Sequence, residues 1–198
     1  MMKREIIIAT KNKGKIKEFK RILSDKEFEI SSLLDISDLP EISEDGNSFE
    51  DNAVKKSRHI FELTGKPCIA DDSGLEIDYL DGAPGVKSSR FCGISTPQSV
   101  KNEKIISMTK GAKENERGAQ FRCVVAFTDN NGKKTFEGIC KGRISDKQKG
   151  LNGFGYDPIF IPEGFDKTFG ELDEDVKNRI SHRAKALRKF YNWFAKNK

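Results

Sequence analysis

The stretch IADDSGLEID, residues 69–78, places two adjacent carboxylates, Asp71 and Asp72, directly after an apolar run. In an extended segment neighbouring side chains point to opposite faces, so the two carboxylates need not share one site. One of them can face a metal ion while the other holds the adjacent loop. The alternative interpretation is a strand that ends in an Asp/Ser/Gly turn, and this stretch alone leaves both open.

The residues before this stretch alternate between strand and helix patterns. Residues 5–10, EIIIAT, form a β-branched run that is too short for a helix, and residues 15–23, KIKEFKRIL, carry apolar side chains at helical spacing. A second helix is predicted from about Ser48 to Leu63, and a Gly-Lys-Pro sequence ends it before a strand at residues 67–71. The two aspartates are therefore expected at the carboxyl end of a strand.

The residues after this stretch continue the same alternation. Thr96 is a predicted N-cap, followed by a first-turn proline, for a helix that stops at Gly111. Alternating apolar residues at 119–128 and an Asn-Gly pair predict a β-hairpin into residues 134–144.

The end of the chain adds a short strand and a helix. The sequence PIFIP at 158–162 predicts the strand, and Ser181 is the predicted cap of a final amphipathic helix. The whole pattern predicts an α/β fold with a mixed sheet. Because there is no repeat, low-complexity tract or linker, residues 1–198 are predicted to form a single domain.

Composition limits the kinds of partner and compartment. A net charge of +5 favours anionic partners but is below the basic excess of an architectural nucleic-acid protein, and it does not choose between a nucleotide and a nucleic acid. Four widely spaced cysteines and two histidines argue against a zinc site. The apolar run at the N-terminus is too short for a signal peptide and no segment has the length of a membrane span, so we expect a cytoplasmic protein without a membrane partner.

The loop ATKNKGKIKE, residues 9–18, places lysines and a glycine between a strand and a helix N-terminus. Free backbone N–H groups and the helix dipole favour an anion there, which indicates a phosphate-binding loop. It is not a Walker A loop, which would need glycine at Ala9 and a hydroxyl residue at Ile16. The alternative is a solvated run of lysines.

The segment EISEDGNSFEDNAVKK, residues 41–56, crowds acidic side chains before a helix on which Asn52 and Lys56 share one face. Most of these acids are expected to be solvated charges favoured by the helix dipole. One of them could complete a carboxylate site with Asp71 or Asp72, and without histidine or cysteine such a site suits Mg²⁺. The acidic residues are Glu41, Glu44, Asp45, Glu50 and Asp51.

Two later motifs indicate recognition of a flat ligand. In GFGYDP, residues 153–158, glycines flank Phe154, whose ring can stack on a base; the alternative is a Gly/Pro loop with a core phenylalanine. In KNRISHR, residues 177–183, a lone histidine is more often a hydrogen-bonding residue at a helix start than a catalyst.

Together and in this order, the segments resemble the inosine triphosphate pyrophosphatase family, over nearly the whole chain. A single motif is weak evidence for this resemblance, but five motifs in the same order are specific. Ser89 is a departure from the pattern, because alanine is more usual at this position in the family. The matching positions are Thr10, Asn12 and Lys15; Glu44, Asn52 and Lys56; residues 71–75; residues 153–158; and residues 181–183, with residues 82–85 and 88–91 also similar.

The resemblance implies an elongated, two-lobed α/β fold around a long mixed sheet, with the active site in the cleft between the lobes and usually a homodimer. It implies the Mg²⁺-dependent hydrolysis of ITP, dITP and XTP to the monophosphate and pyrophosphate. By the same resemblance, Asp72 holds Mg²⁺ with Glu44 and orients or deprotonates the attacking water, while Asp71 is structural.

The resemblance also assigns the substrate contacts. The triphosphate is expected against one set of residues and the purine against another, with Phe154 stacked on the base. The first set is Thr10, Lys11, Asn12, Lys13, Gly14, Lys15, Lys56 and Ser73, and the second is Phe154, Gly155, Tyr156, Asp157, Lys177, His182 and Arg183.

Cationic donors aimed at position 6 of the purine would donate to a keto oxygen and reject the amino group of adenine, by about 10⁴-fold. Rejection of GTP is not explained by this, because guanine has the same keto oxygen. Two other functions stay open: a septum-inhibitor-like nucleotide pyrophosphatase of different specificity, and a basic nucleic-acid-binding module, which would leave the carboxylates unexplained.

Overall fold

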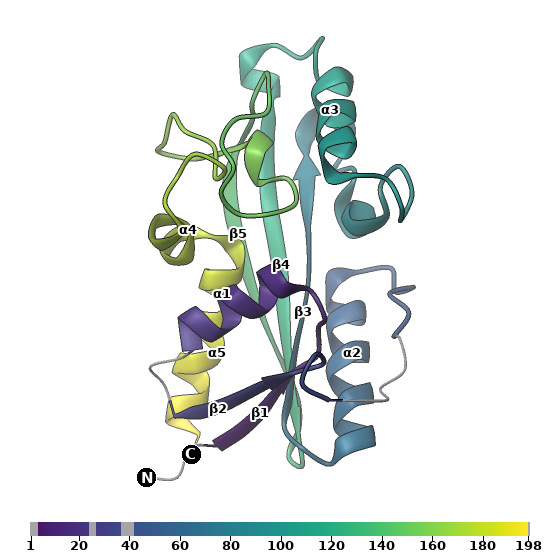
Figure 1. Ribbon diagram of the computed structural model, residues 1–198, viewed down its shortest axis with the longest axis vertical. Helices are drawn as coiled ribbons and strands as arrows, with labels where there is room; N and C mark the ends of the chain where they lie inside the picture. Colours follow the sequence, from purple (N-terminus) through teal and green to yellow (C-terminus); the bar gives the residue numbers. More distant parts are fainter. Residues whose placement is uncertain (1–3, 24–26, 37–41, 198) are drawn as a thin grey trace. The chain divides into compact units, whose positions relative to one another are not determined.

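A computed structural model describes residues 4–23, 27–36 and 42–197 (Figure 1). Within these residues the strands form one six-stranded sheet in the order β2-β1-β3-β4-β5-β6. The strands are β1 (Arg4–Ile8), β2 (Phe28–Ser32), β3 (Cys68–Ile77), β4 (Gly118–Asp129), β5 (Gly132–Ile144) and β6 (Phe160–Pro162). The α-helices are α1 (Lys13–Leu23), α2 (Phe49–Thr64), α3 (Gln98–Met108), α4 (Glu174–Ile180) and α5 (His182–Lys196), and short 3₁₀ turns occupy Asp78–Leu80, Gly85–Arg90, Glu114–Glu116 and Asp157–Ile159.

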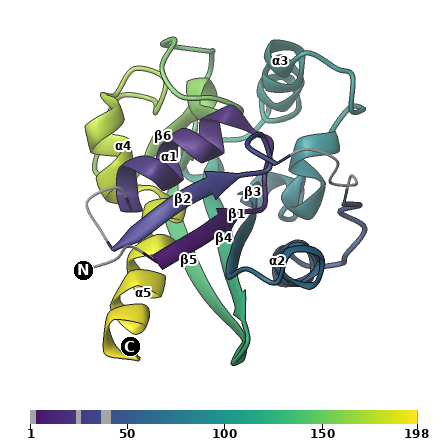
Figure 2. The ribbon, with the colours of Figure 1, turned by 60° about the horizontal axis from the view of Figure 1, so that its bottom comes forward.

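The sheet is mixed, as the sequence predicted. β1 pairs in parallel with both β2 and β3, whereas β5 and β6 are antiparallel. Figure 2 shows β1 and β2 side by side, with Ile6 opposite Ile30 in the register. The α/β class with a mixed sheet is therefore confirmed.

The chain divides into two compact units. The first contains the residues up to Asp72, Cys123–Gly138 and the residues from Arg183 onward, and the second contains Ser73–Arg122 and Ile139–His182. The chain passes from one unit to the other at four places, two of which lie between Asp72 and Ser73 and between His182 and Arg183. Each unit has its own apolar cluster, which explains why it is compact by itself.

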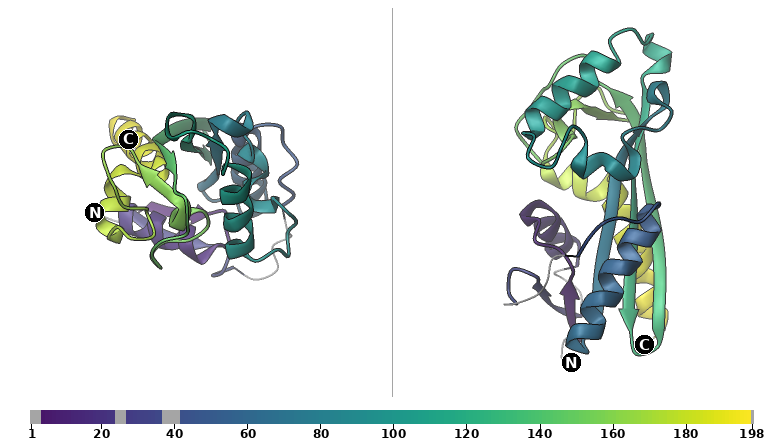
Figure 3. Two further views of the ribbon diagram at one scale, coloured as in Figure 1. Left: turned by 90° about the horizontal axis from the view of Figure 1, so that it is seen from above. Right: turned by 90° about the vertical axis from the view of Figure 1, so that its right-hand side faces the viewer.

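In the first unit, helices cover both faces of the sheet because the strands alternate apolar side chains. Ile6 and Ile8 pack against α1 and α5, whereas Ile7 packs with Ile60 of α2 on the opposite face. Figures 1 and 2 show α2 on one side of these strands and α1 with α5 on the other. The turn between β4 and β5 lies at the end of this unit where α5 finishes (Figure 3).

In the second unit, the core is rich in aromatic rings. Phe121 of β4 packs on Phe160 of β6, with ring centroids 4.6 Å apart, and Phe160 stacks on Phe169 at 5.5 Å. Ile105 of α3 joins the same cluster. The strand predicted for residues 119–128 is confirmed, although burial alternates only up to Cys123 and residues 123–128 are all buried. The predicted apolar face serves both clusters, with Phe121 in one and Cys123, Val125 and Phe127 in the other.

Two sequence predictions need correction, and two elements were missed. β3 does not end at the aspartates but continues to Ile77, because Leu75 and Ile77 are fully buried and extend the strand through the Ser-Gly pair. The N-cap of α3 is Pro97; the hydroxyl of Thr96 instead donates to the carbonyl of Cys92 at 2.5 Å. β2 and α4 lack a strong apolar period and were not predicted.

None of the helices in the described residues has the length and apolar character needed to cross a membrane.

Candidate functional site

Asp71 and Asp72 point to opposite faces of β3 and enter different environments, as the alternation of an extended chain requires. Asp71 lies among groups of α1 and α5, and Asp72 lies among groups of α2. All the contacts described next for these two carboxylates lie within the first unit.

The carboxylate of Asp71 is fully buried and bound to two cations. Arg183 donates to its Oδ2 from Nη2 at 2.8 Å and from Nε at 3.1 Å, and the ammonium of Lys15 lies 3.2 Å from the same oxygen. Arg183 also pairs with Glu18 of α1, a short contact that joins the two helices. Burial opposes ionisation of Asp71, but Arg183 and Lys15 outweigh it and hold the pKa of this carboxyl well below its usual range.

The carboxylate of Asp72 is held by two side chains of α2. Asn52 donates from Nδ2 to Oδ2 at 2.9 Å, and the ammonium of Lys56 lies 3.7 Å from Oδ1. Asn52 also accepts a hydrogen bond from the backbone N–H of Gly46 at 2.8 Å, so it ties the loop before α2 to β3. Burial raises the pKa of Asp72 above its ordinary value, because the more distant Lys56 compensates only in part.

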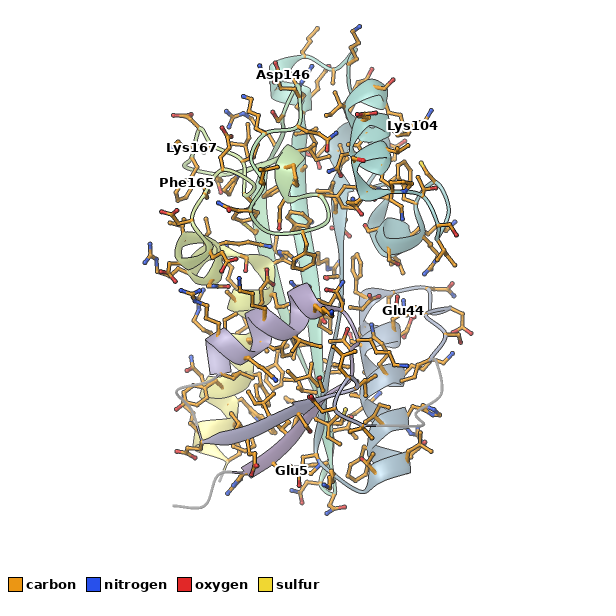
Figure 4. The ribbon with its side chains drawn as sticks, viewed as in Figure 1. Glu5, Glu44, Lys104, Asp146, Phe165 and Lys167 are labelled. Carbon is orange, nitrogen blue, oxygen red and sulfur yellow. The ribbon has the colours of Figure 1, made fainter. Side chains whose placement is uncertain are left out.

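Glu44 lies on the loop that precedes α2 (Figure 4) and pairs with the same ammonium. Its Oε1 lies 2.5 Å from Nζ of Lys56. Burial opposes ionisation of Glu44, but the attraction of Lys56 is stronger in sum and lowers the pKa. Burial also opposes the charge of Lys56, but Asp72 and Glu44 together raise its pKa, so both partners of the pair are ionised at neutral pH.

α2 brings these groups together because its start is well defined. Ser48 is the N-cap, and its side chain accepts a hydrogen bond from the backbone N–H of Asp51 at 3.0 Å. The helix then places Asn52 and Lys56 one turn apart, both buried and on the face toward Asp72.

In the lysine-rich loop, side chains accept hydrogen bonds from the backbone of the same segment just before and at the start of α1. Thr10 Oγ1 accepts from the backbone N–H of Asn12 at 3.2 Å, and Asn12 Oδ1 accepts from the N–H of Lys15 at 3.1 Å. Lys11 and Lys13 are exposed and Gly14 is half-buried. The loop therefore leads into the start of α1, where the ammonium of Lys15 meets Asp71 of β3.

The donors around Asp72 fit a hard cation. Glu44 and Asp72 supply carboxylate oxygens, and Mg²⁺ commonly uses one or two carboxylates together with substrate phosphate oxygens and water. Among the described residues no group of three or more His, Cys, Asp or Glu side chains could hold a metal ion. That result is compatible with a two-carboxylate site completed by the substrate.

In the second unit, Asp157 organises the residues of the glycine-rich loop. Its Oδ2 accepts from the backbone N–H of Phe154 at 2.7 Å and from the ammonium of Lys177 at 2.5 Å. The same ammonium lies 4.5 Å from the centre of the Phe154 ring, in position for a cation–π contact. Asp157 and Lys177 are buried, so they set the orientation of Phe154 within this unit.

Other predicted purine contacts are engaged inside the protein. The hydroxyl of Tyr156 donates to the carbonyl of Ser88 at 2.9 Å, and burial raises its pKa. The carbonyl of Gly155 accepts from Asn102 of α3 at 3.3 Å. His182 stacks on Phe121 with ring centroids 4.7 Å apart. These contacts of the three residues are structural, and their contact with a purine stays a prediction.

The structure thus gathers Asp72, Glu44 and Lys56 around one point in the first unit, and Phe154, Asp157 and Lys177 around another in the second. Ser73 is half-buried in the second unit. Arg183 was predicted at the purine edge, whereas its guanidinium is buried against Asp71 and Glu18. Glu41 lies outside the described residues.

Sequence reasoning missed Glu18 and Asn102 and left Asn52 out of the predicted site. Two signals were available for Asn52, its helical spacing to Lys56 and its place in the family motif. Nothing in the local sequence distinguishes Glu18 from an exposed helix charge.

Fold and site together define an α/β protein with a mixed sheet, in which ammonium groups meet buried carboxylates on both faces of β3. The chain belongs to the Ham1 family, whose model matches residues 6–193. It is 46% identical to a protein from Bacillus licheniformis named dITP/XTP pyrophosphatase, over 94% of this chain and 95% of that protein. A Bacillus subtilis protein of the same name is also 46% identical, over 94% of each chain.

Solved structures agree with this assignment. The Ham1 protein from Staphylococcus aureus has a TM-score of 0.86 and 36% identity, covering 98% of this chain and all of that one. A HAM1 protein from Coxiella burnetii has a TM-score of 0.88 and 37% identity, over 98% of this chain and 99% of that one. The family resemblance expected from the motifs is confirmed.

Proposed function

We propose that this protein is an enzyme that hydrolyses dITP, XTP and ITP to the monophosphate and pyrophosphate, and so removes these nucleotides from the cellular pool. The names of relatives that are 46% identical over nearly the whole chain support this reaction. The observation that carries the proposal is the convergence of Asp72, Glu44 and Lys56, since it provides both carboxylate and ammonium groups for a metal-bound triphosphate.

Asp72 is proposed to act on the attacking water. Its carboxylate is buried and is oriented by the hydrogen bond from Asn52, so it is held in place to accept a hydrogen bond from that water. Glu44 and Asp72 would hold Mg²⁺, which when bound supplies positive charge to the phosphate oxygens. Asp71 stays structural, because its carboxylate is already bound to Arg183 and Lys15.

The cationic groups are proposed to bind and orient the triphosphate. Hydrolysis between the α- and β-phosphates gathers negative charge, so positioning and electrostatic stabilisation account for most of the catalysis. The residues proposed for this task are Thr10, Lys11, Asn12, Lys13, Gly14, Lys15, Lys56 and Ser73.

The purine is proposed to stack on Phe154. Asp157 and Lys177 support this role, because they hold the backbone and the ring of Phe154 in one orientation. Base–aromatic stacking contributes about 1–3 kcal/mol. Gly155, Tyr156, His182 and Arg183 remain predicted contacts of the base, and the location of the site in a cleft between two lobes of a single domain also stays a prediction.

We also propose a homodimer that acts in the cytoplasm on Mg²⁺ complexes of its substrates, with no nucleic-acid or membrane partner. Family membership supports the dimer and the metal, and a substrate drawn from the nucleotide pool supports the compartment.

The test is pyrophosphate release from ITP, XTP, dITP, GTP and ATP, measured in parallel with Mg²⁺ and with chelator. We expect rapid metal-dependent release from the first three and slow release from GTP and ATP. Asp72→Asn should lower turnover of ITP by about 10²-fold or more, since it removes the proposed base, while binding of ITP largely survives.

Asp45→Asn is the matched control, because this carboxylate is exposed and pairs with Lys55 rather than Lys56. If the Asp72→Asn variant hydrolyses ITP at the wild-type rate, Asp72 has no role in the reaction. Hydrolysis confined to other nucleotides would favour a septum-inhibitor-like specificity, and salt-dependent duplex binding without turnover would favour the nucleic-acid-binding module.

A further inference from the structure

The ammonium of Lys56 lies between the two carboxylates proposed to hold the metal. Its Nζ is 2.5 Å from Oε1 of Glu44 and 3.7 Å from Oδ1 of Asp72. The side chains of Lys56 and Asp72 are each 8% exposed, so water screens this contact weakly.

A comparison with the neighbouring Lys55 shows that the buried position is particular to Lys56. Lys55 also pairs with a carboxylate of the loop before α2, with its Nζ 2.6 Å from Oδ1 of Asp45. That pair is 42% and 68% exposed, and an exposed pair of this kind is exchangeable with water at little cost. The next residue, Lys56, instead carries its charge into the interior beside Asp72.

Asp72 is shielded from water, Glu44 is partly exposed, and both carboxylates lie next to the buried ammonium of Lys56. Burial of an ionised carboxylate without a partner is costly, and here the ammonium of Lys56 satisfies Glu44 and part of Asp72 at once. A divalent cation that binds the same oxygens would meet the positive charge of Lys56 at close range, and the two cations repel each other.

We propose that Lys56 is the resident counter-ion of the metal site in the nucleotide-free protein, and that it leaves these carboxylates for the phosphates when metal and nucleotide arrive together. This inference rests on the proposed function, because it takes Glu44 and Asp72 as the metal ligands. Its consequence is that the free protein binds divalent cations weakly and that nucleotide binding and metal binding are positively coupled.

The test is a titration of the nucleotide-free full chain with Mn²⁺. Electron paramagnetic resonance measures the free ion at each point of the titration. Lys56→Met removes the charge and keeps most of the side-chain volume, so Glu44 and Asp72 lose the ammonium that lies nearest to both of them. We expect this variant to bind one Mn²⁺ at least about tenfold more tightly than the wild type, a typical size for a coupling between two sites. Lys55→Met, which changes the net charge equally, should bind Mn²⁺ as the wild type does.

Equal Mn²⁺ affinity of the Lys56→Met variant and the wild type overturns the inference, and so does an equal gain in Lys55→Met. Thermal unfolding with and without Mn²⁺ gives a second readout, in which the ion should stabilise Lys56→Met more than the wild type. Lys56→Gln serves as the variant if the methionine protein does not fold. Tight binding of Mn²⁺ by the wild type without nucleotide also contradicts the inference, and this result needs no variant.

Pyrophosphate release from ITP by the same wild-type sample separates the two proposals. Hydrolysis together with equal Mn²⁺ affinities overturns only the role of Lys56. A lack of hydrolysis overturns the proposed function, while the Mn²⁺ affinities still decide whether Lys56 competes with a cation for these carboxylates.

Discussion

Asp71 has two cations within ion-pair distance and no exposure of its side chain. Removal of one partner from a buried ion pair leaves the others uncompensated and typically costs about 3–5 kcal/mol. We expect Asp71→Asn to lower the free energy of unfolding by that amount in urea denaturation at pH 7, because Arg183 and Lys15 keep their charges. The control Glu62→Gln breaks an exposed pair with Arg58 and should cost about 0–1 kcal/mol.

The pH dependence of the same comparison follows from the lowered pKa of Asp71. A carboxyl whose native pKa is depressed stabilises the fold fully above its unfolded pKa, here near 3.8, and loses that contribution as the pH falls through the lower native value. The difference between wild type and Asp71→Asn should therefore stay constant between pH 8 and about pH 5 and shrink in stronger acid. A difference that grows on acidification would contradict this assignment.

The glycine-rich loop shows how one element positions an aromatic ring. Gly153 and Gly155 both have positive φ, +73° and +64°, so alanine is strained at either position. They differ in space: a Cβ at Gly153 would lie 2.1 Å from Oδ2 of Asp157, whereas nothing lies within 4 Å of one at Gly155. A side chain at Gly153 must therefore displace the carboxylate that holds Phe154 and Lys177.

We expect Gly153→Ala to be destabilised by more than about 1 kcal/mol, and Gly155→Ala to be destabilised less, because only the first adds a clash to the backbone strain. Gly153→Ala should also raise the KM for ITP more than Gly155→Ala does, since Phe154 loses its fixed orientation. Steady-state kinetics and urea denaturation of the two variants provide the comparison. Equal KM values for the two variants would show that the orientation given to Phe154 by Asp157 does not matter for binding of ITP.

At the scale of the whole molecule, β3, β4 and β5 each contribute residues to both compact units, so the units share strands rather than a linker. Sedimentation equilibrium tests the proposed assembly directly. We expect a mass of twice the 22.3 kDa chain, independent of nucleotide, because family membership supports a homodimer. A concentration-independent mass of one chain would contradict the dimer without affecting the proposed chemistry.

Much of the architecture was predictable because it depends on local patterns. β1, α1 and α2 follow from short-range periodicity and capping, and the hairpin follows from its Asn-Gly turn. β2 and α4 were missed because exposed or half-buried residues interrupt their apolar patterns. The end of β3 was misplaced because Ser-Gly is a turn signal locally, whereas burial of Leu75 and Ile77 extends the strand.

The sequence by itself determined the family, the alternation of Asp71 and Asp72, and the one-turn spacing of Asn52 and Lys56, since each depends on the order and period of nearby residues. Only the tertiary structure decided that Arg183 pairs with Asp71 across 112 positions and with Glu18 across 165, and that Lys56 lies between Glu44 and Asp72. These partners are chosen by burial: charges that leave water must find opposite charges nearby, and which charges meet depends on the packing of distant elements.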